Sequence, residues 1–438
     1  MLGKWVPLPG LICAGVPMVK EKRRISSLSS DTRFNMHVYV ARQPIFKRNR
    51  KIYGYELLFR GGVTNVFPDI DGDTATSKLL SNTFFNLGIQ KVCAGKKAFI
   101  NFTQDLLEKK YPLMFPRDQV TVEILENVVP GPEVVCACAD IAEKGYEIAM
   151  DDFFYHNSLE PLLKLSQIIK IDFMATPMDK IAEYVDKLSQ YSVKFLAEKV
   201  ETHEVFHQAL EMGFSYFQGY FFSKPQILKG RDIAPSKINL LHLMAQTNRD
   251  DMEFEDLEKI IARDVSISYK LLRYINSAYY RRLQEISSIR QAIVLLGQRG
   301  MKDFISLIIM ARLSSEKPIE LLRTSIIRAR MCEMLGKNCH HAADNSELFT
   351  LGLFSLIDAI LDQDMEKIME ELPLSEPIKK ALVDGGGHLS PFLHCVKSYE
   401  MGDWGNFSKA VAQVGIGEEK APEIYFDAIE WADSVAGI

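Results

Sequence analysis

The chain of 438 residues lacks a long apolar run, and this absence limits the kinds of protein that it can be. No apolar stretch reaches the roughly 18 residues that a membrane-spanning helix needs. Residues 5–19 are apolar, but they include three prolines and are followed by basic residues, which reverses the order of a secretion signal. We therefore expect a cytoplasmic protein without a membrane span, in which residues 1–35 are a disordered extension.

Cysteines are few, and their spacing shows no pairing pattern. The chain has seven cysteines, an odd number at irregular intervals, which favours free, buried thiols in a reducing compartment. Cys136 and Cys138 lie two residues apart in a stretch with a helical pattern, so they would point to different faces. No second cysteine pair completes a zinc site, and we expect none.

An excess of positive charge is also absent. The formal net charge is -5, which argues against direct binding of nucleic acid. The chain is 47% hydrophobic and 25% charged, as is typical of a globular protein, and its length allows two or three domains.

The pattern of apolar residues divides the chain into two halves. In the first half, eight short apolar segments alternate with helix-length segments, and several are apolar on both faces, as parallel strands covered by helices are. Repeated strand–helix units of this number predict a (β/α) barrel over residues 36–226. The expected strands are 37–41, 52–59, 98–102, 120–125, 147–151, 168–172, 194–197 and 216–220.

The second half has a helical pattern instead. Pro225, Gly230 and Pro235 interrupt the sequence between the halves, and we expect a linker at residues 227–237. Apolar residues at helical spacing then predict an all-helical domain over residues 238–438. The expected helices are 254–275, 289–296, 301–312, 318–335, 346–361, 377–382, 391–401 and 407–414.

Polar residues fall at the ends of the expected strands, where a (β/α) barrel places its chemistry. A buried carboxylate is costly unless it is paired or binds a metal, so a cluster of them favours hard cations such as Mg²⁺ or Mn²⁺. Two such cations suit displacement at phosphorus. Any one of these residues alone could be a solvated strand end or a helix cap, but their recurrence indicates a site. They are Glu56, Asn101, Glu123, Glu126, Asp151, Asp152, Lys170, Asp172, Glu198, Glu201 and Gln218.

These residues lie in motifs that resemble the EAL-domain family of cyclic di-GMP phosphodiesterases, over about residues 37–226. The motifs are Arg42-Gln43-Pro44-Ile45, Glu56-Leu57-Leu58 with Arg60, Asn101, Glu123-Ile124-Leu125-Glu126, Asp151-Asp152-Phe153, Lys170-Ile171-Asp172, Ala197-Glu198-Lys199-Val200-Glu201 and the run from Gln218 to Pro225. The resemblance implies an EAL-type barrel that opens cyclic di-GMP to its linear form.

The resemblance also implies roles for single residues. The first metal would be held by Glu56, Asn101, Glu123 and Asp151, with Asp152 at the second. The attacking water or the metals would be served by Lys170, Glu198 and Glu201. The ligand-binding set would be Gln43, Arg60, Glu126, Asp172 and Gln218, of which Gln218 supports the site.

Three departures from the EAL pattern predict weak or absent hydrolysis. Leu57 replaces an alanine and would be bulkier beside the ligand. The loop after Asp152 is shorter than in the family and has no glycine, so it cannot readily adopt positive φ values. Lys199 replaces the glycine between the two glutamates. His156 in the altered loop could replace a ligand, but an ordinary surface histidine is the expected interpretation.

The helical half resembles the HDOD family, relatives of the HD phosphohydrolases. The resemblance rests on residues 264–277 and 286–297. Where HD enzymes have an adjacent His-Asp pair of metal ligands, this chain has Ser355-Leu356, which implies a regulatory domain without metal chemistry. Such a domain would bind a protein partner that the sequence does not identify.

An EAL-like domain followed by an HDOD domain resembles a class of bacterial signalling proteins. Three functions stay open for this chain. It could be a regulator that binds cyclic di-GMP or partners with weak or no hydrolysis, an active Mg²⁺- or Mn²⁺-dependent phosphodiesterase that yields linear pGpG, or an adaptor that binds no nucleotide. A homodimer is also left open.

Overall fold

The computed structural model of the chain describes residues 39–59, 89–224, 265–277, 288–339, 345–372 and 374–436, together with single positions between 237 and 286. The expected extension at residues 1–35 and nearly all of the expected linker lie outside the described residues.

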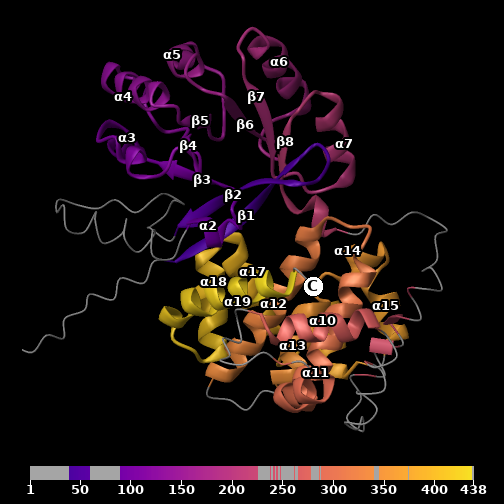
Figure 1. Ribbon diagram of the computed structural model, residues 1–438. Helices are drawn as coiled ribbons and strands as arrows, with labels where there is room; N and C mark the ends of the chain where they lie inside the picture. Colours follow the sequence, from indigo (N-terminus) through magenta and orange to yellow (C-terminus); the bar gives the residue numbers. More distant parts are fainter. Residues whose placement is uncertain are drawn as a thin grey trace, which may run out of the picture. The chain divides into compact units, whose positions relative to one another are not determined.

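Eight strands close into a barrel in chain order, so the predicted barrel is confirmed (Figure 1). The strands are β1 (Val40–Lys47), β2 (Ile52–Phe59), β3 (Lys97–Phe102), β4 (Val120–Ile124), β5 (Glu147–Met150), β6 (Ile168–Asp172), β7 (Lys194–Glu198) and β8 (Tyr216–Gln218).

One strand departs from the expected parallel pattern. Neighbours from β2 to β8 are parallel, but β1 is antiparallel to both β2 and β8. Only four residues join β1 to β2, and a connection this short can only return the chain in the opposite direction. The expectation of parallel strands is therefore wrong for β1.

Helices on the outside of the strands cover the barrel, as Figure 1 shows for α3–α7. Thr202 begins α7, because its Oγ1 accepts a hydrogen bond from the Val205 N–H. In α4, Cys138 is buried against the barrel and Cys136 is exposed, as their spacing predicts. The helices are α2 (Ile89–Val92), α3 (Gln104–Glu108), η1 (Tyr111–Met114), α4 (Pro132–Glu143), η2 (Asn157–Leu159), α5 (Glu160–Leu163), α6 (Met178–Leu188), α7 (His203–Glu211) and η3 (Tyr220–Ser223).

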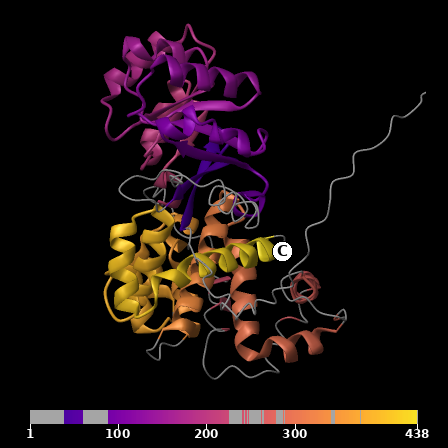
Figure 2. The same ribbon diagram turned by 90° about the vertical axis from the view of Figure 1, so that its left-hand side faces the viewer.

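The described residues after 264 contain helices and no strand, which confirms the predicted all-helical half (Figures 1 and 2). They are α10 (Val265–Ile275), α11 (Ile289–Leu313), α12 (Ile319–Asn338), α13 (Asn345–Phe354), α14 (Ile357–Leu361), α15 (Met365–Glu371), α16 (Glu376–Val383), α17 (Ser390–Met401), α18 (Trp404–Val414), η5 (Glu418–Lys420) and α19 (Ala421–Ala436). Among the residues described, no helix has both the length and the apolarity that a membrane crossing requires.

Within the described residues, the helices match the expected ones with three differences; most of residues 254–264, the first part of the expected helix 254–275, lie outside them. The helix α11 spans two expected helices, and Gly297, with a φ of 70°, breaks it between them. The expected helix at 346–361 divides into α13 and α14 at residues 355 and 356. The short helix α15 and the last helix, α19, were not expected from the apolar pattern.

The first two strands also contribute to the apolar core of the helical half. Ala41 of β1 and Leu58 of β2 are buried in the same cluster as the side chains of α11–α19. Strand β1 packs directly against α17. These contacts bring helical residues next to the polar side chains of β1 and β2.

Gly219 allows the end of β8 to lie against the loop that follows β7. Its φ is 144°, and a Cβ at this position would lie 2.2 Å from the Val200 carbonyl oxygen. The Val200 N–H donates to the Gln218 carbonyl at 3.0 Å, and its carbonyl accepts from Phe221 at 3.0 Å. A side chain at position 219 would therefore push two hydrogen-bonded backbone segments apart.

We predict that Gly219→Ala lowers the free energy of unfolding by about 2–3 kcal/mol, as other changes that force a backbone clash do. The matched control is Gly213→Ala, where φ is 93° but no atom lies within 4 Å of the new Cβ. This control should lose only about 1 kcal/mol. Urea denaturation measures both, and equal losses would contradict the proposed clash.

In the helical half, the carboxyl group of Asp303 is largely buried beside that of Glu333. Burial raises the pKa of Asp303 in α11 to about 7, and the carboxylate of Glu333 in α12 adds to the rise. Arg299, Lys337 and Arg330 oppose this shift. Because the folded pKa exceeds the ordinary value of 3.8, the contribution of Asp303 to stability is full only below about pH 4 and is lost as the pH rises from there through about 7.

We predict that Asp303→Asn raises the melting temperature more at pH 8 than at pH 5.5, because the stability lost through Asp303 grows between about pH 4 and pH 7. The exposed position Asp179 of α6 offers a control, since Asp179→Asn should give the same small change at both values. Thermal unfolding at the two pH values measures the difference. A shift for Asp303→Asn that is independent of pH would contradict this prediction.

Candidate active site

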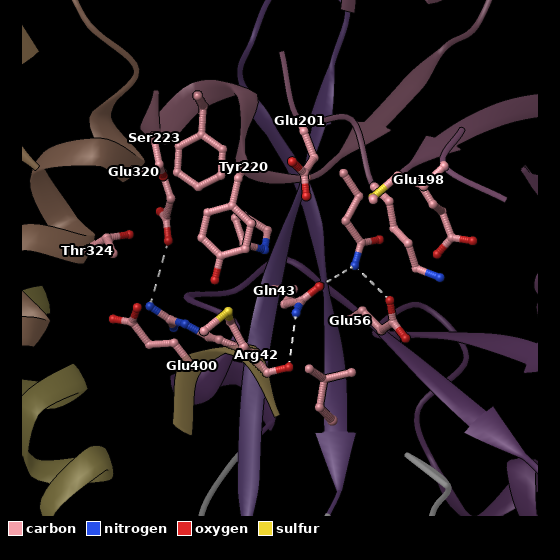
Figure 3. Close-up of a pocket in the computed structure, with 18 of the residues that line it drawn as sticks. Arg42, Gln43, Glu56, Glu198, Glu201, Tyr220, Ser223, Glu320, Thr324 and Glu400 are labelled. Atoms are coloured by element: carbon pink, nitrogen blue, oxygen red, sulfur yellow. Dashed lines mark hydrogen bonds and ion pairs between the residues drawn. The ribbon is translucent and has the colours of Figure 1, made fainter. Parts of the chain in front are cut away.

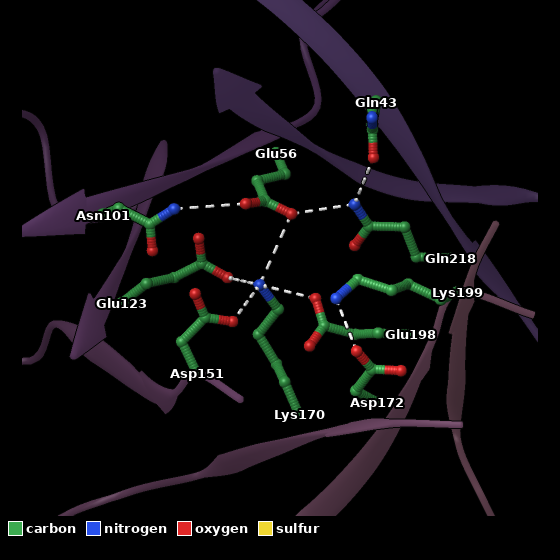
Figure 4. A network of polar contacts seen from close by, with 10 residues as sticks. All are labelled: Gln43, Glu56, Asn101, Glu123, Asp151, Lys170, Asp172, Glu198, Lys199 and Gln218. Atoms are coloured by element: carbon green, nitrogen blue, oxygen red, sulfur yellow. Dashed lines mark hydrogen bonds and ion pairs between the residues drawn. The ribbon is translucent and has the colours of Figure 1, made fainter. Parts of the chain in front are cut away.

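One buried ammonium group lies at the centre of the polar side chains in the barrel (Figure 4). Lys170 of β6 is fully buried, and its Nζ lies 2.7 Å from Glu123 Oε1 and 2.7 Å from Asp151 Oδ1. The same atom lies 3.0 Å from Glu198 Oε1 and 3.4 Å from Glu56 Oε2. Four predicted site carboxylates therefore converge on one cation.

The strand register explains this convergence. Asn101 of β3 pairs with Glu123 of β4, and Asp172 of β6 pairs with Glu198 of β7. Asp151 follows β5, and its N–H extends the ladder by donating to the Ile124 carbonyl at 2.9 Å. These residues end their strands at the same edge of the barrel, where side chains from neighbouring strands meet.

Glu56 is held from two further sides. Asn101 donates from Nδ2 to Glu56 Oε1 at 3.1 Å, and Gln218 donates from Nε2 to Glu56 Oε2 at 2.8 Å. Gln218 Nε2 also donates to Gln43 Oε1 at 3.0 Å. The structure thus connects Glu56, Asn101, Gln43 and Gln218 in one network around the carboxylates.

Burial and mutual repulsion shift the protonation of this cluster. Burial raises the pKa of Glu123 and of Glu198 well above the ordinary range, although the ammonium of Lys170 opposes the shift. Burial would lower the pKa of Lys170, but the surrounding carboxylates, with Asp151 foremost, raise it well above its ordinary value. Lys170 is therefore protonated, and its single positive charge faces four carboxyl groups.

The oxygen atoms of the cluster suit a hard divalent cation. Besides Glu123 Oε1, which pairs with Lys170, four buried oxygens of the cluster accept no hydrogen bond from the described residues: Asn101 Oδ1, Glu123 Oε2, Glu198 Oε2 and Gln218 Oε1. Carboxylate and amide oxygens are the ligands that Mg²⁺ and Mn²⁺ prefer. Within the described ranges, however, no three acidic, histidine or cysteine side chains are already arranged around a vacant metal position. A cation would therefore compete with Lys170 for these oxygens.

Several predicted site residues lie away from Lys170. Glu201 forms an ion pair with Lys224 at 3.1 Å, and 46% of its side chain is exposed. Glu126 is exposed beside the pocket, and Arg60 lies outside the described residues. Asp152 has a φ of 38°; burial and the neighbouring carboxylate of Asp151 raise its pKa.

Asp172 also points to other partners. Its carboxylate accepts hydrogen bonds from Lys199 Nζ, from the Met174 N–H at 2.7 Å and from the Ala175 N–H at 2.9 Å. Burial alone would raise the pKa of Asp172, but these hydrogen bonds outweigh burial and lower it. Asp172 therefore fixes the loop after β6.

Two of the three departures from the EAL pattern, Leu57 and Lys199, have structural explanations. Leu57 lies in the apolar core outside the barrel and does not line the pocket, so the expectation that it lies beside the ligand is wrong. Side chains alternate along a strand, and Glu56 takes the inward direction. Lys199 adopts a left-handed φ of 51°, as a glycine would, and binds Asp172. His156 is exposed and caps η2 through Ser158, which agrees with an ordinary surface histidine.

A pocket of about 480 Å³ opens over this cluster (Figure 3). Barrel residues that line it include Gln43, Glu56, Asn101, Asp151 and Glu198. The helical half supplies a further part of the lining, which we call the helical wall: Glu320, Thr324, Ile327, Arg328, Glu400, Met401 and Tyr425. Sequence reasoning missed the helical wall, because periodicity identifies these helices but not their partners.

Ser355, which stands where HD enzymes have a metal ligand, is hydrogen-bonded to other residues of the chain. Ser355 Oγ donates to the Gly352 carbonyl at 2.8 Å and accepts from Arg328 Nη1 at 3.3 Å. Arg328 also forms an ion pair with Glu400 at 2.7 Å. A cationic side chain thus lies beside the position at which HD enzymes have a metal ligand.

Comparisons with known proteins agree with both resemblances. The EAL domain family matches residues 71–225, and the HDOD domain family matches residues 235–374. A Vibrio cholerae protein named cyclic di-GMP phosphodiesterase CdgJ is 39% identical over 400 residues, which cover 91% of this chain and 93% of that protein. The uncharacterized protein YuxH of Bacillus subtilis is 36% identical over 91% of this chain and 99% of its own length.

Among solved structures, the EAL enzyme Bd1971 in its cAMP- and cyclic di-GMP-bound form has a TM-score of 0.35 at 20% identity. The match covers 44% of this chain and 62% of that chain, a likeness too slight for a functional conclusion.

We predict that Lys170→Met destabilises the metal-free chain by about 3–5 kcal/mol, because it leaves buried carboxylates without their cation. Added Mn²⁺ should restore much of this loss by replacing the missing charge. The control is Lys97→Met, which breaks the partly exposed ion pair with Glu147 at 2.8 Å and should respond little to Mn²⁺. Thermal unfolding in EDTA and in Mn²⁺ measures both, and a Lys170→Met variant as stable as the wild type in EDTA would refute the prediction.

Proposed function

Because the chain belongs to the family in which an EAL domain precedes an HDOD domain, we propose that its barrel binds cyclic di-GMP and hydrolyses it with Mg²⁺ or Mn²⁺. The convergence of Glu56, Glu123, Asp151 and Glu198 on Lys170 carries this proposal. An acidic, oxygen-rich cluster at the mouth of a barrel, below a pocket, suits metal-assisted chemistry on a phosphodiester. The name of the Vibrio cholerae relative supports the same reaction.

In this reaction, a water oxygen attacks phosphorus, the bond from phosphorus to the 3′ oxygen breaks, and the 3′ oxygen takes up a proton. The product is linear pGpG. A divalent cation, when bound, neutralises charge on the phosphate and acidifies a water molecule. Glu56, Asn101, Glu123 and Asp151 would hold one cation, and Asp152 would help with a second.

The remaining side chains would act on protons and position. Glu198 lines the pocket and lies 3.0 Å from Lys170 Nζ, so its carboxylate would be placed to accept the proton of the attacking water. Lys170 would keep the carboxylates in place and offset charge that develops on the phosphate. Glu201, at the edge of the pocket, would assist with the water or the metals, and Gln43 and Gln218 would orient the ligand or Glu56.

A second function is binding of cyclic di-GMP without turnover, as the sequence departures predict. The observation that favours it is that cationic side chains of the chain itself already bind the acidic groups. Lys170 engages four carboxylates, and Lys199 engages Asp172 from a left-handed backbone position. The nucleotide-bound barrel would then act on a protein partner through the helical domain, and homodimers would be compatible with either function.

We predict that the purified chain converts cyclic di-GMP to pGpG with Mn²⁺ or Mg²⁺, and that EDTA abolishes the conversion. Glu56→Gln should lower the rate by about 100-fold or more, because it removes a charged oxygen ligand. Glu147→Gln is a matched control in the same barrel, since Glu147 begins β5 and lies at the opposite end from Asp151.

Chromatography of the nucleotides measures the product, and calorimetry measures binding. Product that the Glu56→Gln variant also forms would contradict the proposed site. Binding without product would support the second function. A chain that neither binds nor cleaves the nucleotide would contradict both functions and would favour the adaptor.

A further inference from the structure

The C-terminal end of α17 accepts a hydrogen bond from a barrel side chain that the ligand would use. Gln43 Nε2 of β1 donates a hydrogen bond to the Met401 carbonyl at 3.4 Å. The next residue, Gly402, has a φ of 67°, and a Cβ there would lie 2.9 Å from Leu58 Cδ1. This close approach holds the end of α17 against β1 and β2. The amide of Gln43, a predicted ligand-binding residue, is thus engaged by the helical half.

The first turn of α12 engages the same two strands through buried charges. Glu320 Oε1 lies 3.9 Å from Arg42 Nη2 of β1, and Glu320 Oε2 accepts a hydrogen bond from the Tyr55 hydroxyl of β2 at 2.9 Å. Arg323 donates to the Tyr55 hydroxyl at 2.8 Å. All four side chains are buried. Arg323 also forms an ion pair with Asp433. Loss of the Glu320 charge would therefore leave the buried Arg42 without its carboxylate partner, so these contacts make the closed arrangement sensitive to that charge.

The helical wall includes two carboxylates and a backbone carbonyl, beside Arg328 and the hydroxyl residues Thr324 and Tyr425. Glu320 and Glu400 are carboxylates, and Met401 contributes a carbonyl. Among the described residues of the helical wall, Arg328 is the one cationic side chain, and it forms an ion pair with Glu400 at 2.7 Å. Glu400 also acts on the barrel, because its carboxylate adds to the effect of burial, which raises the pKa of Tyr220 to about 12.

An anionic nucleotide and the helical wall would therefore bind the same hydrogen-bond donors of the barrel. Cyclic di-GMP carries two phosphates, which repel carboxylates and which need donors such as Gln43. In the structure, the Glu320 carboxylate faces Arg42 and the Met401 carbonyl accepts from Gln43, so these groups take the place that the phosphates would have. The contacts of the closed pocket are thus alternatives to the contacts of a bound nucleotide.

We propose that the helical domain inhibits the barrel by direct competition: the end of α17 and the start of α12 occupy the β1 side of the pocket, and cyclic di-GMP binds only when this wall withdraws. The inference rests on the proposed binding of cyclic di-GMP and adds how that binding is regulated. A partner or signal that draws the helical domain away from β1 would activate the barrel.

The first test weakens the closed arrangement without altering the barrel. Glu320→Gln keeps the shape of the side chain and an acceptor for Tyr55, but it removes the charge that faces Arg42 and Arg323. Because the closed state loses stability, the dissociation constant for cyclic di-GMP should fall by about tenfold, within the usual range of coupling between sites. Calorimetry in the presence of Ca²⁺ measures this dissociation constant. If a parallel incubation yields product, a phosphorothioate analogue replaces the nucleotide.

The matched control is Glu333→Gln on the same helix. Glu333 is also buried and forms ion pairs with Arg330 at 2.8 Å and with Arg299 at 3.5 Å, but it does not line the pocket. This variant should bind cyclic di-GMP as the wild type does. Thermal unfolding of both variants checks that they are folded.

The outcomes separate the inference from the function on which it rests. Unchanged or weaker binding by a folded Glu320→Gln variant would overturn the inference, and weaker binding would mean that the helical wall contributes contacts to the nucleotide. Tighter binding by Glu333→Gln as well would also overturn it. If neither the wild type nor Glu320→Gln binds the nucleotide, the proposed function itself fails.

A second test needs no substitution and decides the matter if Glu320→Gln does not fold. Hydrogen exchange is followed in the wild-type chain with and without cyclic di-GMP, at saturating nucleotide. Withdrawal of the wall predicts faster exchange of the last turn of α17, residues 396–401, and no change in α13. Slower exchange or no change in α17 on nucleotide binding would overturn the inference.

Discussion

The charge of Lys170 is the constraint on which the site depends. Without it, the barrel would bring together carboxylates from four strands in a dry interior, where their repulsion and desolvation would oppose folding. With it, Glu56, Glu123, Asp151 and Glu198 have a common partner. Buried oxygens beside it accept no hydrogen bond from the described residues and would suit a divalent cation. On the proposed function, folding and metal binding would therefore use the same side chains.

Much of the barrel site could be predicted from the sequence because strand periodicity carries the needed information. Glu56, Asn101, Glu123 and Lys170 each occupy an inward position near the end of a strand, and closure of the barrel brings such positions together. The same alternation decides the case of Leu57, which follows an inward residue and so belongs to the outer core. Its expected position beside the ligand failed because the motif was considered without the direction of each side chain.

Features that depend on packing between distant segments could not be predicted. The sequence of α12 places Glu320, Arg323 and Arg328 among apolar residues, which by itself suggests a helix with charged solvent-facing positions. The structure buries all three charges, because β1, β2 and α17 supply their partners. The antiparallel pair of β1 and β2 is a similar case. Its Ala41 and Leu58 are buried in the apolar core of the helical half, a contact between distant segments. The pocket is therefore a property of both halves, although each half was recognisable alone.

The central claim is that the carboxylates around Lys170 form a divalent cation site. Anomalous diffraction from crystals of the chain grown with Mn²⁺ tests this claim most directly, since it locates the cation without an assumption about activity. The account predicts an anomalous peak bounded by oxygens of Glu56, Asn101, Glu123 and Asp151. Crystals at high Mn²⁺ in which Lys170 Nζ keeps all four carboxylates and no peak lies beside them would contradict it.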